Sequence, residues 1–436
     1  MTRAAAHGAI AVLAGLLLST ASAQAADLGG NCCADLEERV AELEATTARK
    51  GNRRMSLTVS GQVTRSILYW NDGSDSGTYA GLDSHNQSTR FVFSGSAKIR
   101  PDLTAGFEFM TEIGSGGRTS TADQLSPDGG AAGAFVASDA ILAVRTANWW
   151  LEDKRLGRVT VGRINVSGPV GTIDLGGIST VAHWSPALTG GAFFVGGNIG
   201  GNGAVRLTNI IGPTYGGDRI EGIRYDTANL GGFVGQAVWG EDDVWSASLR
   251  YAGEFGGIRV AAGIGYQAQD STNTQPIQLD TGARNIDNEW SGSLALMHVG
   301  SGLFAQGHYA ESEFFNGTDA KFWMVQAGIT KNWFGLGNTS LYGEYGEAQD
   351  FIKGGVASGA SNLSVLFPAA SSDATFFGIG VVQQIDAAAM ELFLGWRRFE
   401  VDVSGLAGAG SLTTPGAPGN GSSDLDIVHG GARIRF

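Results

Sequence analysis

The stretch SLTVSGQVTRSILYW, Ser56–Trp70, alternates apolar and polar side chains over most of its length. The apolar set is Leu57, Val59, Val63, Ile67 and Tyr69, and the polar set is Thr58, Ser60, Gln62, Thr64 and Ser66. Successive side chains of a strand point to opposite faces, so this stretch predicts a β-strand with one apolar and one polar face. Alternation over about ten residues is typical of a half-solvated sheet or of the wall of a membrane barrel.

The same period recurs to the last residue of the chain and predicts sixteen strands in all. They are 56–70, 88–99, 103–112, 138–149, 157–165, 219–226, 232–239, 244–253, 257–267, 289–299, 303–313, 321–333, 339–347, 374–385, 390–401 and 424–436. We expect boundary errors of about two to four residues at each strand end.

The connections between these strands alternate between long and short. Most odd-numbered connections are long, and the even-numbered ones are all short. A soluble sandwich has no reason to keep its long loops at one end, whereas an outer-membrane barrel keeps tight turns in the periplasm and long loops outside. The sequence therefore predicts an all-β fold, a 16-stranded antiparallel transmembrane β-barrel. Hydrocarbon offers no hydrogen-bond partners, so such a sheet must close on itself. At this strand number we expect water to fill the lumen, without a packed core.

Composition agrees with one large β-architecture. The chain has 436 residues with 68 glycines, 9 prolines and 43% hydrophobic residues. Its net charge of −13 disfavours nucleic acid as a partner, because phosphate binding needs a cationic surface.

The N-terminus carries features of secretion. Residues 1–25 predict a signal peptide with a short apolar core and a small-x-small cleavage site. Residues 26–55 would form a periplasmic segment with one short helix at 35–50, and 56–436 the barrel. The adjacent Cys32 and Cys33 match no metal-ligand spacing; inert thiols, a local disulfide and pairing between chains all remain open.

The helix region also carries a family resemblance. The stretch NCCADLEERVAELEATTARK, Asn31–Lys50, continued by VSGQV at Val59–Val63, resembles the N-terminal region of porins from rhizobia and related alphaproteobacteria. The terminal GGARIRF, Gly430–Phe436, is similar to the last strand of outer-membrane barrels. The resemblance implies a general-diffusion porin of the cell outer membrane, commonly a homotrimer, whose third external loop folds inward. It also implies that Phe436 and Ile434 belong to a signal read by the barrel-assembly machinery.

The third loop would be 166–218, the longest connection. The resemblance implies that acidic groups on this loop face basic groups on the wall, and Asp174 is the main acidic candidate. The candidate basic residues are Arg90, Arg145, Arg163 and Arg224. The alternation turns Arg90 toward the lumen, but Arg163 shares its side with Val159 and Val161. We retain Arg163 and Arg224 because their strands flank the long loop, where bulges alter the phase.

The favoured function is a water-filled channel for passive diffusion of small hydrophilic solutes and ions. A substrate-selective channel of the same architecture and a non-conducting structural or adhesive barrel remain alternatives. The chain contains no nucleophile-elbow motif and no metal-ligand cluster, so we predict neither an enzyme, a metal site nor a cofactor. Outer-membrane lipids and lipopolysaccharide would surround the barrel. Arg65 has the phase of a lipid-facing residue, so a bulge, a subunit interface or an error in phase must accommodate it.

Overall fold

The computed structural model describes residues 55–113, 117–124, 142–166, 170, 173–195, 205–211, 219–268, 286–315, 317–354, 357–358, 361–362, 371–404 and 421–436. The predicted signal peptide at 1–25 and the helix at 35–50 lie outside these ranges. Among the described residues, no helix is both long and apolar enough to cross a membrane.

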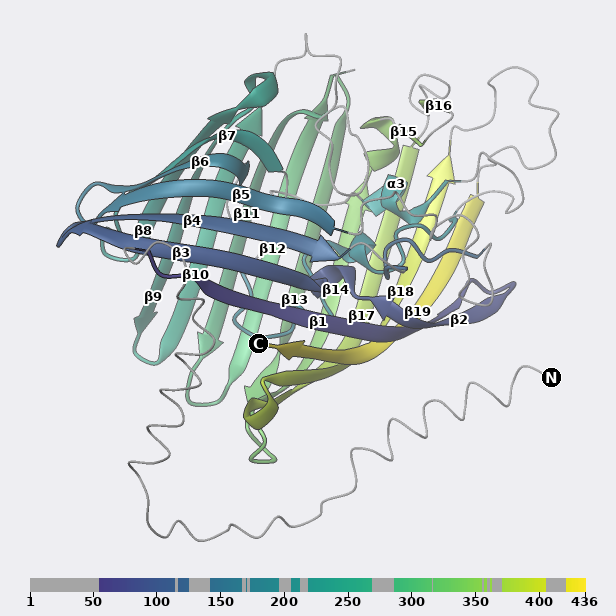
Figure 1. The fold of residues 1–436 in the computed structure, drawn as a ribbon. Helices are drawn as coiled ribbons and strands as arrows, with labels where there is room; N and C mark the ends of the chain where they lie inside the picture. Colours follow the sequence, from purple (N-terminus) through teal and green to yellow (C-terminus); the bar gives the residue numbers. More distant parts are fainter. Residues whose placement is uncertain are drawn as a thin grey trace, which may run out of the picture. The chain divides into compact units, whose positions relative to one another are not determined.

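Seventeen described strands form one antiparallel sheet. Most pair with the strands next to them in the chain, but β2 and β3 both pair with β1 and not with each other. The sheet closes because β1 pairs with the last strand, β19, from Gln62↔Arg435 to Asn71↔Asp426. Figure 1 shows the two walls of the resulting barrel, with β1 to β5 crossing in front of β11 to β18.

The strands are β1 Thr58–Asn71, β2 Ser76–Asp83, β3 Arg90–Arg100, β4 Leu103–Ile113, β5 Leu142–Asp153, β6 Gly157–Asn165, β7 Arg219–Asp226, β8 Phe233–Gly240, β9 Trp245–Phe255, β10 Ile258–Ala268, β11 Ile286–His298, β12 Leu303–Phe314, β13 Asp319–Lys331, β14 Thr339–Gln349, β17 Ser371–Ile385, β18 Met390–Ser404 and β19 Gly421–Arg435. A separate two-stranded sheet is formed by β15 Ala357–Ser358 and β16 Ser361–Asn362. The short helices are η1 His85–Gln87, η3 Pro186–Leu188, α3 Leu207–Ile211, η4 Glu241–Asp243, η5 Phe351–Gly354 and η6 Asp386–Ala388.

The strand β2 was not predicted. It pairs with β1 from Arg65↔Asp83 to Asn71↔Ser76, whereas β3 pairs with the beginning of β1, from Thr58↔Ser94 to Gln62↔Arg90. The sequence SGTYAGLD reads as a turn because two glycines interrupt it, and the pairing with β1 overrides that preference. Without β2, sixteen strands close the ring, and each coincides with a predicted stretch. The largest shift is in β5, predicted at 138–149.

The short connections lie at one end of the barrel. Between β9 and β10, Phe255 pairs with Ile258, and only Gly256 and Gly257 separate them. Their φ values are +55° and +79°, as a two-residue hairpin turn with both central residues left-handed requires. Glycine adopts that backbone without steric cost, so the predicted tight turn forms here.

The alternation separates two faces of the wall. On β1, the outward Val59, Val63 and Ile67 are 43–45% exposed, whereas the inward Gln62 and Thr64 are buried. The predicted apolar outer face and polar inner face are therefore confirmed for this strand.

Part of the interior, however, is apolar. Buried side chains from β12 to β19, β1 and β2 pack with loop segments into one cluster inside the barrel. Its largest members include Trp70, Tyr79, Phe193, Phe314, Phe322, Phe376 and Phe399. The expectation of a lumen without a packed core is wrong on this side, because the loops bring apolar side chains inside.

Candidate functional site

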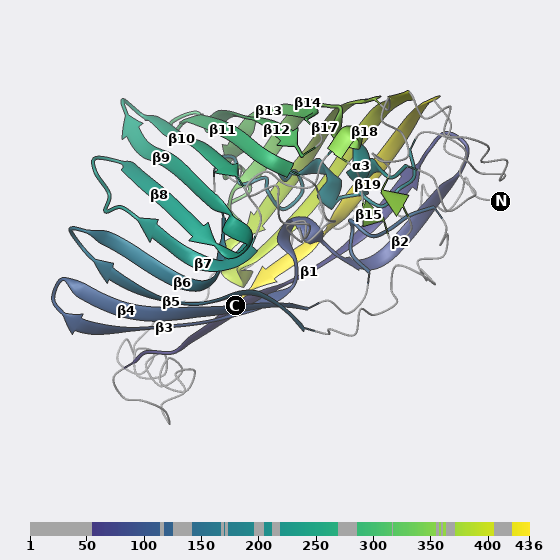
Figure 2. The same cartoon turned by 90° about the horizontal axis from the view of Figure 1, so that it is seen from above.

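The third long loop runs inside the barrel. Its described segment 173–195 hydrogen-bonds through backbone carbonyls to inward side chains of the wall. The donors are Thr330 Oγ1 and Ser340 Oγ to Gly176 O (2.8 and 2.6 Å), Gln326 Nε2 to Ala182 O (3.1 Å) and Arg397 Nη1 to Pro186 O (3.3 Å). These bonds run from β13, β14 and β18 to successive points of the loop, as the predicted inward fold requires. Figure 2, seen from above, shows α3 near β17 and β18. The helix α3 contacts β14 and β17.

A buried ion pair fixes the middle of this loop. Arg397 donates two hydrogen bonds to Glu344, from Nε to Oε1 at 2.8 Å and from Nη2 to Oε2 at 3.0 Å. The two side chains are only 8% and 1% exposed. The same guanidinium also holds Pro186 O, so the pair joins β14 and β18 to η3. A bidentate pair of this kind fixes position as well as charge.

A second pair fixes the loop a few residues earlier. Glu391 accepts a hydrogen bond from Thr180 Oγ1 at 2.7 Å and lies 2.6 Å from Arg433 Nη2. Arg435 also contacts this carboxylate. Glu391 is 3% exposed, so its charge is neutralised by neighbours rather than by water. Together, the Glu344–Arg397 and Glu391–Arg433 pairs are two latches on the third loop.

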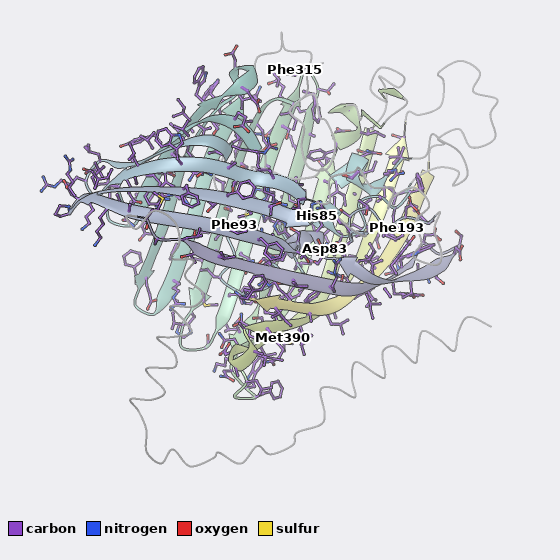
Figure 3. All side chains as sticks on the ribbon, viewed as in Figure 1. Asp83, His85, Phe93, Phe193, Phe315 and Met390 are labelled. Atoms are coloured by element: carbon purple, nitrogen blue, oxygen red, sulfur yellow. The ribbon has the colours of Figure 1, made fainter. Side chains whose placement is uncertain are left out.

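The two preceding loops also enter the barrel. Asn86 Nδ2 donates to Val181 O at 3.1 Å, and Thr119 Oγ1 donates to Leu188 O at 2.8 Å. Figure 3 shows Asp83 and His85, which lie at the end of β2 and in η1. Asp83 accepts hydrogen bonds from Thr89 N and Oγ1 at 3.0 and 2.7 Å, which holds this segment in place. Three loops therefore build one interior assembly.

The inner wall of β7 to β9 carries a different arrangement. Asp226 accepts a hydrogen bond from Arg224 Nε at 2.9 Å and lies 3.5 Å from Arg250 Nη2. Gln236 donates to its other oxygen at 2.9 Å. The two arginines are 23% and 32% exposed, well above Arg397. Two cations share one anion here, which leaves one positive charge in surplus.

Arg90 and Arg145 both point inward, beside Glu112. Arg90 lies opposite Glu112 in the β3–β4 register, and Arg145 forms an ion pair with it. The register of β4 and β5 shifts between Met110 and Thr111, and this bulge leaves Arg145 without a directly opposed residue. The bulge thus turns Arg145 toward the interior, where the strand phase alone was ambiguous.

Arg163 does not belong to this interior set. It lies opposite Ala147 and Glu221, on the face that carries Val159 and Ile223, which are 39% and 45% exposed. Directly opposed residues of an antiparallel pair share a face, so Arg163 points outward. Its Nη1 lies 3.9 Å from Glu221 Oε1. The hypothesis that Arg163 lines the constriction is wrong, because the register of β6 contains no bulge that would invert its phase.

Asp174 lies inside the barrel but does not present a free carboxylate. It accepts hydrogen bonds from the backbone N–H groups of Gly177, Ile178 and Ser179 at 2.8–2.9 Å. Gln306 Nε2 approaches it at 3.4 Å. The carboxylate closes a turn of the loop, which explains its position but weakens its predicted role opposite the arginines.

Among the described residues of the third loop, His183 has the largest shift in pKa. Burial, followed by the charges of His85, Arg397, Arg145 and Arg90, lowers the pKa of His183 to about 3. The imidazole is therefore neutral at ordinary pH, and its Nδ1 accepts a hydrogen bond from Ser185 N at 3.2 Å.

Ile434 and Phe436 lie on the outer face. They are 47% and 57% exposed, and Ile434 lies opposite the outward Val63. The Phe436 ring is 5.8 Å from that of Phe91. Their role in assembly stays a prediction.

The latches themselves were not predicted. Arg397 and Arg398 are adjacent, so the alternation requires one of them to face inward, and that signal was present in the sequence. Their partners follow only from the register, which pairs β14 with β17 and β17 with β18. Within the described ranges, no group of three or more His, Cys, Asp or Glu side chains is placed to hold a metal ion.

Comparisons with known proteins complete this description. The family model of the Gram-negative porins matches residues 9–403. A search of curated protein sequences found no match.

Several solved structures are similar to the chain. A loop L8 deletion mutant of OmpT, an outer membrane protein of Vibrio cholerae, is 13% identical, with 88% of this chain and 100% of that chain covered and a TM-score of 0.49. An anion-selective porin from Comamonas acidovorans is 16% identical, with coverages of 88% and 100% and a TM-score of 0.48. Salmonella typhi OmpF in complex with daunomycin is 15% identical, with coverages of 88% and 98% and a TM-score of 0.49.

Proposed function

The chain belongs to the Gram-negative porin family and is an outer-membrane channel, and from this premise we propose that its water path lies off-centre, along the inner wall of β3 to β9. Small hydrophilic solutes and ions would cross by passive diffusion between this wall and the third loop. The family is one of channels, which favours this function over an enzyme.

The single observation that carries the proposal is the unequal filling of the interior. Inward aromatic side chains of β12 to β18 are fully buried under the loops, whereas Arg224 and Arg250 remain 23% and 32% exposed. Water can occupy only the part of the lumen that side chains leave open. The accessible arginines also supply fixed positive charge, which attracts anions in a water-filled passage.

The channel proposal is tested by reconstituting the full-length protein in planar lipid bilayers. We expect ohmic single-channel steps with weak ion selectivity. Conductance that saturates and is blocked by one solute would favour the substrate-selective alternative. Silent bilayers with correctly assembled protein would contradict a channel and favour a structural barrel.

We also propose that the protein assembles as a homotrimer through the outer face around Arg65. Arg65 points outward between Val63 and Ile67 and lies opposite Ala432. Asp83 lies opposite it in the β1–β2 register and interacts with its charge, but no described acid lies within ion-pair distance of it. An arginine facing lipid near the bilayer midplane costs about 2–4 kcal/mol, and a polar contact from a second copy would offset that cost.

Cross-linking and mass measurement in mild detergent test the trimer. We expect a species of three chains that the substitution Arg65→Glu dissociates, while Arg163→Glu, also outward-facing, leaves it intact. A monomer in the unmodified protein, or an intact trimer in R65E, would contradict this interface.

Within the family, we infer a rhizobial type from the resemblance at Asn31–Lys50. We further infer a cleaved signal peptide at 1–25 and recognition of Ile434 and Phe436 by the barrel-assembly machinery. Deleting Phe436 should lower the amount of assembled barrel in the outer membrane; unchanged amounts would contradict that role.

A further inference from the structure

Arg250, on the inner wall of β9, has hydrogen-bonding capacity that the described residues do not use. Its side chain is 32% exposed, and within the described ranges its one ion-pair contact joins Nη2 to Asp226 Oδ1 at 3.5 Å. Its Nε is closed off from solvent and has no hydrogen-bond partner in the described part of the chain. A guanidinium carries five N–H donors in a fixed fork that suits an oxyanion. An anion that enters from solution would therefore find unfilled donors here.

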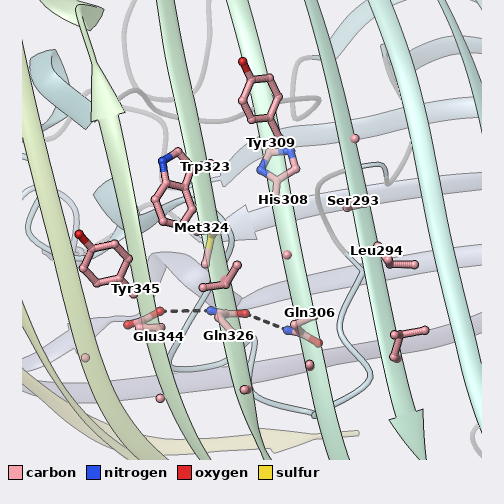
Figure 4. A pocket seen from close by; sticks show the side chains of 18 of the residues that line it. Ser293, Leu294, Gln306, His308, Tyr309, Trp323, Met324, Gln326, Glu344 and Tyr345 are labelled. Carbon is pink, nitrogen blue, oxygen red and sulfur yellow. Dashed lines mark hydrogen bonds between the residues drawn. The ribbon is translucent and has the colours of Figure 1, made fainter.

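Inward polar side chains on another part of the wall are hydrogen-bonded to one another. Figure 4 shows Gln306 Nε2 donating to Gln326 Oε1 at 2.8 Å, and Gln326 Nε2 donating to Glu344 Oε2 at 3.1 Å. Both oxygens of Glu344 accept from the Arg397 guanidinium. Arg397 thus has a carboxylate matched to its fork, whereas Arg250 shares its carboxylate with a second arginine.

Asp226, the carboxylate beside Arg250, is held in one orientation. Gln236 Nε2 donates to Asp226 Oδ1 at 2.9 Å, and Ser248 Oγ donates to Gln236 Oε1 at 3.5 Å. Arg224 Nε donates to the other oxygen, Oδ2, at 2.9 Å. A carboxylate oxygen accepts about two hydrogen bonds, and from the described residues Oδ2 receives this one. One acceptor position therefore remains on Asp226, beside the two arginines.

A buried hydroxyl lies next to the same arginine. Thr160 is directly opposite Arg224 in the β6–β7 register and is 3% exposed. Its Oγ1 has no hydrogen-bond partner within the described ranges. Buried polar groups are nearly always paired, so an unpaired hydroxyl points to a partner that comes from outside the chain. A ligand oxygen between Thr160 and Arg224 would satisfy it.

The third loop covers the site on one side. Val170 of this loop is fully buried, and its Cα lies 3.4 Å from the position that a Cβ on Gly263 would occupy. Gly263 is directly opposite Arg250 in the β9–β10 register. Asp226 is the last residue of β7, so the site lies between the third loop and the short-turn end of the barrel. In a partly enclosed site, attraction between charges is stronger than in open water.

We propose that Arg224, Arg250 and Asp226 bind monohydrogen phosphate. This inference rests on the proposed water path along β3 to β9, which would bring the anion to the site. The two guanidinium groups would donate to phosphate oxygens, and the single O–H of the anion would donate to Asp226 Oδ2. Sulfate carries the same charge but has no O–H, so its oxygens would face the carboxylate with no hydrogen between them. The site therefore distinguishes two anions of equal charge.

Binding is measured by calorimetry on the purified full-length protein in detergent. Potassium phosphate and potassium sulfate are titrated separately above neutral pH, where monohydrogen phosphate is the main phosphate species. We expect saturable phosphate binding at least roughly tenfold tighter than sulfate binding. Arg250→Gln should weaken phosphate binding at least about tenfold, because hydrogen bonds to a charged group are lost.

The matched control is Arg259→Gln, which removes the same charge from the same wall. Arg259 is paired with Glu254 at 3.0 Å and lies four residues from Gly263 on β10, hence on the same face. That separation is about 13 Å along the strand, beyond the screening length of about 10 Å in 0.1 M salt. We expect phosphate affinity in this variant to be close to that of the unmodified protein.

The substitution Asp226→Asn separates a ligand contact from a structural role. The amide that replaces the carboxylate can donate to an anion oxygen, so sulfate is no longer disfavoured. We expect the preference for phosphate over sulfate to disappear while phosphate still binds. A preference that persists in this variant would overturn the proposed contact between the phosphate O–H and Asp226.

Equal affinities of the unmodified protein for phosphate and sulfate would overturn the site, and so would unchanged phosphate affinity in Arg250→Gln. Because binding is measured in solution, either result is distinct from silent bilayers, which would contradict the channel. If Arg250→Gln fails to assemble, the ratio of the two affinities in Asp226→Asn decides the question.

Discussion

The inner walls on opposite sides of this barrel are built from different chemistry. The inward face of β17 and β18 carries Phe376 and Phe399, which are 0% exposed beneath the loops. The inward face of β7 to β9 carries Arg224 and Arg250, which share Asp226 and stay partly exposed. The first wall holds the loop assembly in place. The second is packed in part, since Ile220 and Val238 are buried with Val166 of the third loop, but its two arginines stay partly exposed. A pore can therefore be narrowed by packing one side of its lumen and leaving the other polar.

The first latch, the Glu344–Arg397 pair, gives the largest expected effect on stability. Glu344→Ala leaves Arg397 buried without its bidentate partner, and breaking a buried pair in this way costs about 3–5 kcal/mol. We expect the free energy of unfolding in detergent to fall by that amount and single-channel current to become noisier as the loop loosens. Urea unfolding and bilayer recordings measure the two effects.

The matched control for the latch is the double substitution Glu344→Gln with Arg397→Gln, which removes both charges. It should recover part of the lost stability, because neither residue leaves a buried charge. If Glu344→Ala unfolds at the same urea concentration as the unmodified protein, the Glu344–Arg397 pair does not hold the loop.

The packed wall can be weakened without substituting a charged residue, although the Phe376 ring lies 5.8 Å from the Arg397 guanidinium. Phe376→Leu removes part of a fully buried ring, and we expect a loss of roughly 1–3 kcal/mol in the free energy of unfolding. Ion selectivity should not change, since the substitution lies away from the accessible arginines. A shifted reversal potential in this variant would mean that the packed wall also borders the water path.

The polar wall predicts the opposite pattern. Arg224→Gln with Arg250→Gln removes two positive charges from a partly exposed site, and each charge interacts with a passing ion by about 1 kcal/mol in a watery environment. We expect the reversal potential in a salt gradient to move toward cation preference. Stability should also fall, because Asp226, whose side chain is 12% exposed, loses both cations and keeps the hydrogen bond from Gln236. Arg163→Gln, on the outer face, is the control and should leave selectivity unchanged. An unaltered reversal potential in the double variant would place the water path elsewhere.

The contrast between Arg163 and Arg145 shows what the sequence alone could predict. Period 2 identifies which residues share a face, and it located all sixteen strands of the ring and the phase of Arg90, but it left the phase of Arg224 undecided. It cannot locate a bulge: one turned Arg145 inward, and none is present at Arg163, which stays outside with Val159. It also cannot identify the lumen side where both faces are apolar, as on β18, where Phe399 faces inward and Leu394 outward. Which face points into the lumen depends on the loops that pack inside the barrel, and hence on contacts between residues far apart in the chain.

The smallest expected effect is on the pH dependence of the free energy of unfolding. It again distinguishes the two sides of the lumen, because His183 lies in the loop held against the packed wall. Its pKa is about 3 in the folded protein and about 6.5 in an unfolded chain. Well above pH 6.5 neither state binds the proton, so stability is unaffected. Below it, the unfolded chain gains a proton that the folded loop excludes, and stability falls as the pH drops.

From pH 7.5 to 6.0 this linkage amounts to about 0.8 kcal/mol for one such histidine. Other groups near the loop, His85 among them, also respond to pH, so the useful quantity is the difference between His183→Gln and the unmodified protein. Urea unfolding at the two pH values should show a smaller acid loss in the variant, by about that amount. If the variant and the unmodified protein lose the same stability between the two pH values, His183 takes up its proton in the folded state as it does in the unfolded chain. Water would then reach the loop from the packed side as well as from the polar one.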